Sequence, residues 1–191
     1  MRLLSIDVVS MYPSIPVDKA LDLALDSLEE HRGALSEVSW LEPAQVVQLL
    51  RLSIENTFAV VESITGPRYF RQLKGLAMGK AYSPVLSDIF MGWWEEGMEE
   101  TAAQTGGELI FARRYMDDYL IGFRGSDDNL INFLQALNSK DPSIKVTHEM
   151  ETNGKIPFLD ILITRSVEGF QTEVYRKPCN TNYAGPPSSF S

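Results

Sequence analysis

Two adjacent carboxylates, Asp117 and Asp118, stand between two short apolar runs, residues 109–112 and 119–121. Such runs are typical of two strands joined by a tight turn, with the aspartates at its tip. Like charges repel, so a fold gains little from two carboxylates there. A divalent cation supplies a reason, because Mg²⁺ binds carboxylate oxygens and two such ions about 3.5–4 Å apart assist phosphoryl transfer. The alternative is a solvated turn, in which aspartate is common.

A third carboxylate, Asp7, lies near the C-terminal end of the strand-like run Leu3–Val9. An aspartate in an apolar strand is costly unless it is paired or bound to a metal. If this strand lies beside the aspartate hairpin, three carboxylates converge at one edge of a sheet. This pattern predicts a two-metal site, and the alternative is a structural acidic cluster.

Three ordered strings of the chain resemble motifs of reverse transcriptases. Residues 7–16 (Asp-Val-Val-Ser-Met-Tyr-Pro-Ser-Ile-Pro) resemble motif A, and residues 75–84 (Gly-Leu-Ala-Met-Gly-Lys-Ala-Tyr-Ser-Pro) resemble motif B. Residues 115–118, Tyr-Met-Asp-Asp or YMDD, resemble motif C. The strings at 155–163 and 172–178 further resemble the Penelope-like retroelement reverse transcriptases, a subgroup related to telomerase.

The resemblance covers nearly the whole chain and implies the palm of an RNA-directed DNA polymerase, a nucleotidyltransferase. We expect an α+β fold, with an RRM-like antiparallel sheet packed on helices and with fingers and thumb largely missing. Residues 1–182 would form the palm and residues 183–191 a flexible tail. The implied partners are an RNA template, a DNA primer and dNTPs. The implied cofactor is a pair of Mg²⁺ ions, with Mn²⁺ as the substitute.

The resemblance also assigns roles to residues of motifs A and C. Asp7, Asp117 and Asp118 would be catalytic and would bind the metal ions, with the Val8 backbone carbonyl as a further ligand. Tyr12 lies five residues after Asp7, where related enzymes place an aromatic ring that excludes a ribonucleotide 2′-hydroxyl. The alternative is a core tyrosine packed at the end of the strand.

Motif B contributes two expected nucleotide-binding residues. Met78 and Gly79 match a place where many relatives carry Gln-Gly and would lie against the nascent base pair, with core filling as the alternative for Met78. Ser83 is expected to cap a helix whose first turn contains Pro84. The residues Lys80-Ala81 depart from the Ser-Pro of the family pattern.

The end of the chain offers candidates for primer contact and proton transfer. Tyr175, Arg176 and Lys177 would contact the primer backbone, as the primer-grip hairpin of similar enzymes does; the alternative is a basic surface pair. Lys155 and His148 are rival candidates for a proton donor to pyrophosphate, but neither falls in a motif, and the sequence favours both as ordinary surface residues.

The net negative charge of the chain is unusual for a protein that binds nucleic acid. The chain has 191 residues and 44% hydrophobic side chains, enough for one domain, but its net charge is −9. Nucleic-acid-binding domains are usually basic, because phosphate neutralisation drives affinity. The acidic pairs fall on expected outer helix faces or loops. Since the chain starts at motif A, we expect the basic surface to lie on missing flanking segments, the fingers before it and the thumb after it. We therefore expect the isolated chain to bind primer–template weakly and to extend it poorly.

Targeting features are few. No apolar run approaches the roughly 20 residues that span a bilayer, so no membrane partner is expected. The start, Met1–Asp7, is too short and too acidic for a signal peptide. The single cysteine, Cys179, excludes an internal disulfide and a cysteine-rich zinc site and favours an intracellular setting. A retroelement origin would imply the nucleus. Nothing in the sequence indicates the oligomeric state.

Hydrophobic periodicity predicts interleaved strands and helices. Strands are expected over Leu3–Val9, Phe58–Ile64, Arg68–Lys74, both sides of the aspartate turn, Ile144–Glu149, Ile156–Thr164 and Phe170–Tyr175. Helices are expected over Val17–His31, Pro43–Asn56, Pro84–Ala102 and Asp127–Leu137.

Two other functions remain open. The first is a non-catalytic nucleic-acid-binding palm within a larger protein, against which the three intact aspartates argue. The second is another palm-like enzyme such as a nucleotide cyclase. The chain has no Gly-Gly-acidic-acidic-Phe turn, and Met78-Gly79 has no role in such an enzyme.

Overall fold

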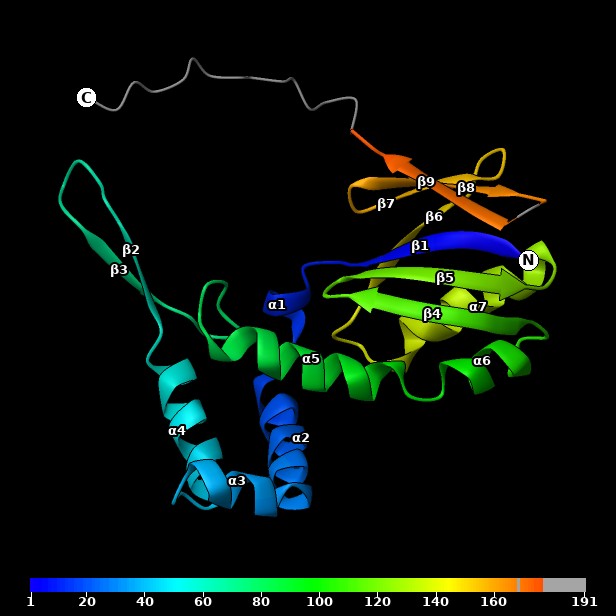
Figure 1. Ribbon diagram of the computed structural model, residues 1–191. Helices are drawn as coiled ribbons and strands as arrows, with labels where there is room; N and C mark the ends of the chain where they lie inside the picture. The colour runs from blue at the N-terminus through cyan, green and yellow to red at the C-terminus, as the bar shows by residue number, and fades with distance from the viewer. Residues whose placement is uncertain (168, 177–191) are drawn as a thin grey trace, which may run out of the picture.

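The computed structural model describes residues 1–167 and 169–176, which form an α+β architecture (Figure 1). Its centre is a four-stranded antiparallel sheet in the order β4-β5-β1-β6. Lys177, Cys179 and the expected tail at 183–191 lie outside the described residues. The strands of this sheet are β1 (Arg2–Val8), β4 (Glu108–Tyr115), β5 (Asp118–Arg124) and β6 (Val146–Met150).

Alternation along β1 divides its side chains between two environments. Leu4, Ile6 and Val8 are buried in the main hydrophobic core, whereas Ser5 and Asp7 lie on the opposite face, as the two-residue period of a strand requires. The strand expected over Leu3–Val9 is therefore confirmed, and its one carboxylate is kept out of the core.

Helices cover the core face of the sheet. Helix α5 contributes Phe90 and Trp94 to the core, and α7 contributes Phe133 and Leu137. Helix α2 packs on α5 and α4. The helices are α1 (Met11–Ser14), α2 (Val17–Glu30), α3 (Arg32–Val38), α4 (Pro43–Glu55), α5 (Tyr82–Glu95), α6 (Met98–Gln104) and α7 (Asp127–Lys140).

A second, three-stranded antiparallel sheet lies against the other face of β1 (Figure 1). Leu3 packs there with Ile156 and Ile163 in a small separate core. The strands are β7 (Lys155–Phe158), β8 (Ile161–Ser166) and β9 (Gly169–Val174). The two sheets together form the walls of the site described below.

A hairpin of β2 (Phe58–Val61) and β3 (Arg68–Arg71) forms a separate two-stranded sheet. It projects from the body of the protein between α4 and α5 (Figure 1). The hairpin expected around residues 65–67 is thus confirmed. None of the helices in the described part of the chain combines the length and the apolar character that crossing a bilayer requires.

Three expectations about local structure are wrong. The helix expected over Pro84–Ala102 is interrupted at Gly97, whose φ of +72° ends α5 and starts α6. The strand expected over Ile156–Thr164 folds back as the β7–β8 hairpin, with Leu159 at φ +53°. Ser83 is not a helix cap, because α5 already begins at Tyr82 and the buried Ser83 hydroxyl donates to the Ala77 carbonyl at 2.6 Å. The short helices α1 and α3 were not expected.

Candidate active site

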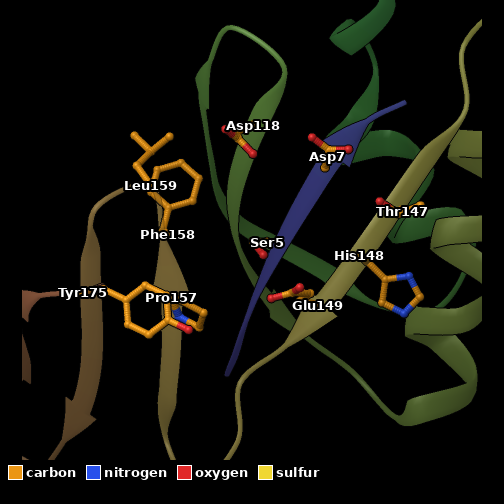
Figure 2. Close-up of a pocket in the computed structure, with 10 residues that line it drawn as sticks. All are labelled: Ser5, Asp7, Asp118, Thr147, His148, Glu149, Pro157, Phe158, Leu159 and Tyr175. Atoms are coloured by element: carbon orange, nitrogen blue, oxygen red, sulfur yellow. The ribbon is translucent and has the colours of Figure 1, made fainter. Parts of the chain in front are cut away.

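Two of the three aspartates are brought together by the pairing of β1 with β5. Asp7 and Asp118 are direct cross-strand partners in this antiparallel ladder. The Val8 amide donates to the Asp117 carbonyl at 3.0 Å, so the end of β1 is also tied to the turn. Side chains of direct partners lie on one face with Cβ atoms about 4.5–5.5 Å apart. Figure 2 shows the two carboxylates side by side at the ends of neighbouring strands.

The turn between β4 and β5 has an unfavourable backbone conformation. Tyr115 and Asp118 close it as a pair, leaving Met116 and Asp117 as the two central residues. Met116 has a φ of +57°, which costs a residue with a side chain about 1–2 kcal/mol. Two-residue hairpin turns ordinarily carry Asn-Gly or Asp-Gly at these positions. Backbone strain of this kind concentrates at functional sites, so the turn is a candidate site by its geometry as well as by its charges.

A pocket of about 480 Å³ opens between the two sheets beside the aspartate pair (Figure 2). Its polar wall comes from β1, β5 and β6 of the central sheet, and its largely apolar wall from the β7–β8 turn and the residue that follows β9. The residues lining it are Ser5, Asp7, Asp118, Thr147, His148, Glu149, Pro157, Phe158, Leu159 and Tyr175.

The donor set at the aspartate pair suits a hard cation. Asp7, Asp117 and Asp118 offer carboxylate oxygens, which Mg²⁺ prefers. Within the described residues, however, no three His, Cys, Asp or Glu side chains gather closely enough to hold a metal ion by themselves. Mg²⁺ in phosphate-handling sites is usually bound by one or two carboxylates together with substrate phosphates and water. The residues therefore fit an ion that arrives with its substrate rather than a closed structural site.

The expected nucleotide-binding residues lie on a different segment from the pocket. Tyr12, on α1, is half-buried against the main core, and its carbonyl accepts a hydrogen bond from the Leu76 amide at 2.8 Å. This bond brings the 75–80 loop beside the end of β1. Met78 is 78% exposed, so the core-filling alternative for Met78 is wrong. Gly79, with a φ of +83°, is exposed next to it.

The glycine that begins motif B explains how the loop approaches α1. Gly75 has a φ of +71°, and a Cβ built there would lie 2.4 Å from the Pro13 carbonyl oxygen. Only a residue without a side chain allows this contact. The geometry therefore brings the start of motif B, Gly75-Leu76, against α1 through backbone contacts alone.

The expected primer-contact residues are divided by the structure. Tyr175 lines the pocket opposite the aspartates, held by a hydrogen bond from its amide to the Asp160 carbonyl at 2.8 Å. Arg176 is exposed, and Lys177 lies outside the described residues. The pocket wall formed by Phe158 and Leu159 was missed, because the turn between β7 and β8 was not expected.

The two candidate proton donors are both displaced from the aspartates. Lys155 is exposed at the start of β7 and does not line the pocket. His148 is on the pocket rim, but Figure 2 shows its ring on the opposite side of β6 from Glu149. Glu149 itself pairs with Ser5 and lies on the Asp7 face of the sheet. The two-residue period of a strand fixes the position of Glu149 once the β1–β6 register is known. That register could not be predicted from the sequence.

Ion pairs join the end of β4, next to the Met116-Asp117 turn, to α5. The Arg114 side chain, only 15% exposed, contacts the carboxylates of Asp88 at 2.8 Å and Glu95 at 3.2 Å, both on α5. Burial of the guanidinium works against its charge, but the hydrogen bonds and charges of these carboxylates prevail and raise the pKa of Arg114. Arg114 is therefore a permanent cation that fastens the end of β4 to α5.

Three solved structures with a similar fold are nucleic-acid polymerases. Apo telomerase from Candida tropicalis, truncated from its C-terminal domain, matches 90% of this chain and 35% of its own, with a TM-score of 0.60 and 13% identity. Telomerase from Candida albicans, in complex with a TWJ fragment of telomeric RNA, matches 85% of this chain and 30% of its own, with a TM-score of 0.62 and 12% identity. The RNA-dependent RNA polymerase of BmCPV at the elongation state matches 85% of this chain and 16% of its own, with a TM-score of 0.59 and 18% identity.

The TM-scores show a fold shared with these polymerases, and the chain spans only a minor part of each of them. No family model and no curated protein matches the chain.

Proposed function

We propose that this chain is the catalytic palm of an RNA-directed DNA polymerase of Penelope-like type. The observation that carries the proposal is the pairing of Asp7 with Asp118 beside a strained Met116-Asp117 turn. The shared polymerase fold supports it, as does the presence of telomerase among the structures with that fold. Residues 1–182 would form the palm, with RNA template, DNA primer and dNTPs as partners.

In the proposed reaction, the primer 3′-oxygen attacks the α-phosphorus of a dNTP. One phosphorus–oxygen bond forms and the bond to the bridging oxygen breaks, so that pyrophosphate leaves and the hydroxyl proton is lost. Asp7, Asp117 and the Val8 carbonyl would hold two Mg²⁺ ions, with Asp118 beside them. Such ions lower the pKa of the attacking hydroxyl and neutralise the triphosphate.

The chain's own residues would position the substrates. The Leu76–Tyr12 hydrogen bond joins the loop that carries Met78 and Gly79 to α1, and Tyr12, Met78 and Gly79 would hold the incoming nucleotide. A flat ring at Tyr12 would leave no room for a 2′-hydroxyl, which favours DNA synthesis. Tyr175, across the pocket from the aspartates, would contact the primer, and Arg176 and Lys177 would continue that contact.

Primer extension tests the proposal. The protein, in the longest form that its gene encodes, is given an RNA template, a DNA primer, dNTPs and Mg²⁺. Asp7→Asn and Asp117→Asn should each abolish detectable extension while the melting temperature changes little, because each removes a metal-binding oxygen. Asp26→Asn, an exposed carboxylate on α2, is the matched control and should extend normally.

Two results would count against the proposal. Near-normal extension by either aspartate variant would remove the catalytic assignment. Tight binding of primer–template with no extension under any metal would favour the non-catalytic nucleic-acid-binding palm instead.

A further inference from the structure

The β2–β3 hairpin, here called the arm (residues 58–71), has no cover on either face. All eight residues of its two strands are exposed. Two-stranded hairpins are marginally stable in water unless a third strand or another surface packs on them. The arm therefore presents an extended surface to something outside the described structure.

The register of the arm gathers aromatic and cationic groups on one face. Phe58 lies directly opposite Arg71, and Val60 lies opposite Tyr69. Because alternate residues share a face, these four residues form one surface, here called the stacking face. Its rings are open to solvent, with Tyr69 70% exposed and Phe58 55% exposed. The reverse face repeats the combination with Phe70 and Arg68.

The charge of the arm is opposite to that of the rest of the chain. The arm carries two cations, Arg68 and Arg71, against one carboxylate, Glu62, in a protein of net charge −9. Within the described residues no carboxylate pairs with Arg68 or Arg71, whereas arginines such as Arg51 and Arg114 are paired. Two guanidinium groups left free beside exposed rings are complementary to an anionic partner.

Aromatic rings interleaved with free arginines are the chemistry of single-strand recognition. Bases stack on aromatic faces whatever their sequence, and the guanidinium groups neutralise the phosphates between them. An apolar protein partner would need neither arginine, and a purely electrostatic site would need no exposed rings.

The arm also joins the body next to the candidate nucleotide-binding segment. At its base the Gln72 amide donates to the Thr57 carbonyl at 2.9 Å, and the Gln72 side chain donates to the Gly75 carbonyl at 3.0 Å. Gly75 begins the loop that Leu76 ties to Tyr12. A nucleic-acid strand bound along the arm would therefore extend toward the loop that carries Met78 and toward Tyr12.

We propose that the arm binds single-stranded nucleic acid through its stacking face. The identification of that strand as the template rests on the proposed function, but the binding itself does not.

Binding of the 191-residue chain to a fluorescent 15-nucleotide oligo(U) RNA, followed by fluorescence anisotropy without metal or dNTP, tests the inference. Tyr69→Ala should weaken binding about tenfold, since each stacked base is worth roughly 1–3 kcal/mol. Arg71→Gln should lower the slope of log K against log[salt] by about 0.7, the contribution of one phosphate contact to a single strand. Trp40→Ala, which removes an 88% exposed aromatic ring outside the arm, and Arg124→Gln are the controls and should bind as the parent does.

The outcomes separate this inference from the proposed function. Unchanged affinity in both arm variants, or no binding by the parent chain at 50 mM salt, overturns the arm as a nucleic-acid site even if Asp7→Asn abolishes extension. The arm variants could instead bind RNA as the parent does but lose a self-association, or a protein contact, that the parent shows. That result would overturn the inference in favour of a protein interface. Circular dichroism melting checks that the exposed substitutions leave the fold in place.

Discussion

A single methyl group at Gly75 provides a sharp test of the geometry that joins motif B to motif A. In Gly75→Ala the new Cβ would lie 2.4 Å from the oxygen and 2.6 Å from the carbonyl carbon of Pro13. Both are backbone atoms, so no rotamer change relieves the contact and the 75–80 loop must move away from α1. That movement breaks the hydrogen bond from the Leu76 amide to the Tyr12 carbonyl.

The cost has three parts. A φ of +71° costs alanine about 1–2 kcal/mol relative to glycine. Loss of the Leu76–Tyr12 hydrogen bond costs about 0.5–1.5 kcal/mol. Residual overlap with Pro13 adds to these terms, so we expect Gly75→Ala to lower the free energy of unfolding by about 2–4 kcal/mol.

Gly97 offers a matched comparison. Its φ of +72° is nearly that of Gly75, but a Cβ there meets only the flexible Glu100 side chain at 3.6 Å. Gly97→Ala should therefore show the conformational cost alone, about 1–2 kcal/mol. Urea unfolding of both variants gives the difference between their free energies of unfolding. The KM for dNTP in the primer-extension assay shows whether the displaced loop weakens nucleotide binding. Equal losses of stability in the two variants would refute the close approach of the loop to α1.

Three further predictions follow from single side chains. Tyr12→Ala should raise the ratio of kcat/KM for ribonucleotides to that for deoxyribonucleotides by at least about tenfold, and an unchanged ratio would make Tyr12 a packing residue only. Arg114→Ala should lower the free energy of unfolding by about 1.5–3 kcal/mol, because it removes charge-assisted hydrogen bonds to Glu95 and Asp88; the exposed neighbour Arg113→Ala should cost less than about 0.5 kcal/mol. Burial alone would raise the pKa of the Asp141 carboxyl, but hydrogen bonds from Ser143 and Lys19 outweigh burial and lower that pKa. Asp141→Asn should therefore be less stable than the parent at pH 7, and the gap in unfolding free energy should shrink as the pH falls below the ordinary aspartate value of about 3.9; a gap independent of pH would contradict this.

Patterns set by local periodicity were predictable from the sequence. The alternation in β1, the apolar runs on either side of the Asp117 turn and the helical spacing in α2 each depend on neighbours within a few residues. The breaks inside elements were not predictable in this way. The apolar residues between Ile156 and Ile163 suit one continuous strand, yet Leu159 takes a φ of +53° and the chain reverses. The reversal lets Ile156 of β7 and Ile163 of β8 both pack with Leu3, a contact distant in sequence.

The pocket was beyond sequence reasoning for the same reason. Ser5 and Glu149 belong to two strands far apart in the chain, and neither lies in a position that a motif marks. Tyr175 was expected to contact a primer, but its place in a pocket wall was not predictable. The convergence of these three residues depends on the β1–β6 register and on the placement of the second sheet. Met78 illustrates a related difficulty, because a methionine in an apolar string suits the core equally well, and only the structure shows it exposed.

The pairing of the two catalytic candidates is a consequence of core burial. Leu4, Ile6 and Val8 are each at most 1% exposed, so β1 has one face that must point toward the helices. A slip of one residue in its register with β5 would exchange the two faces. Asp7 would then enter an apolar core without a partner, at a cost of several kcal/mol. The hydrophobic residues therefore hold Asp7 on the pocket face opposite Asp118 even though no contact between the carboxylates favours that position. The chain therefore keeps two like charges adjacent on the pocket face, and in the proposed function a cation and its substrate would relieve their repulsion.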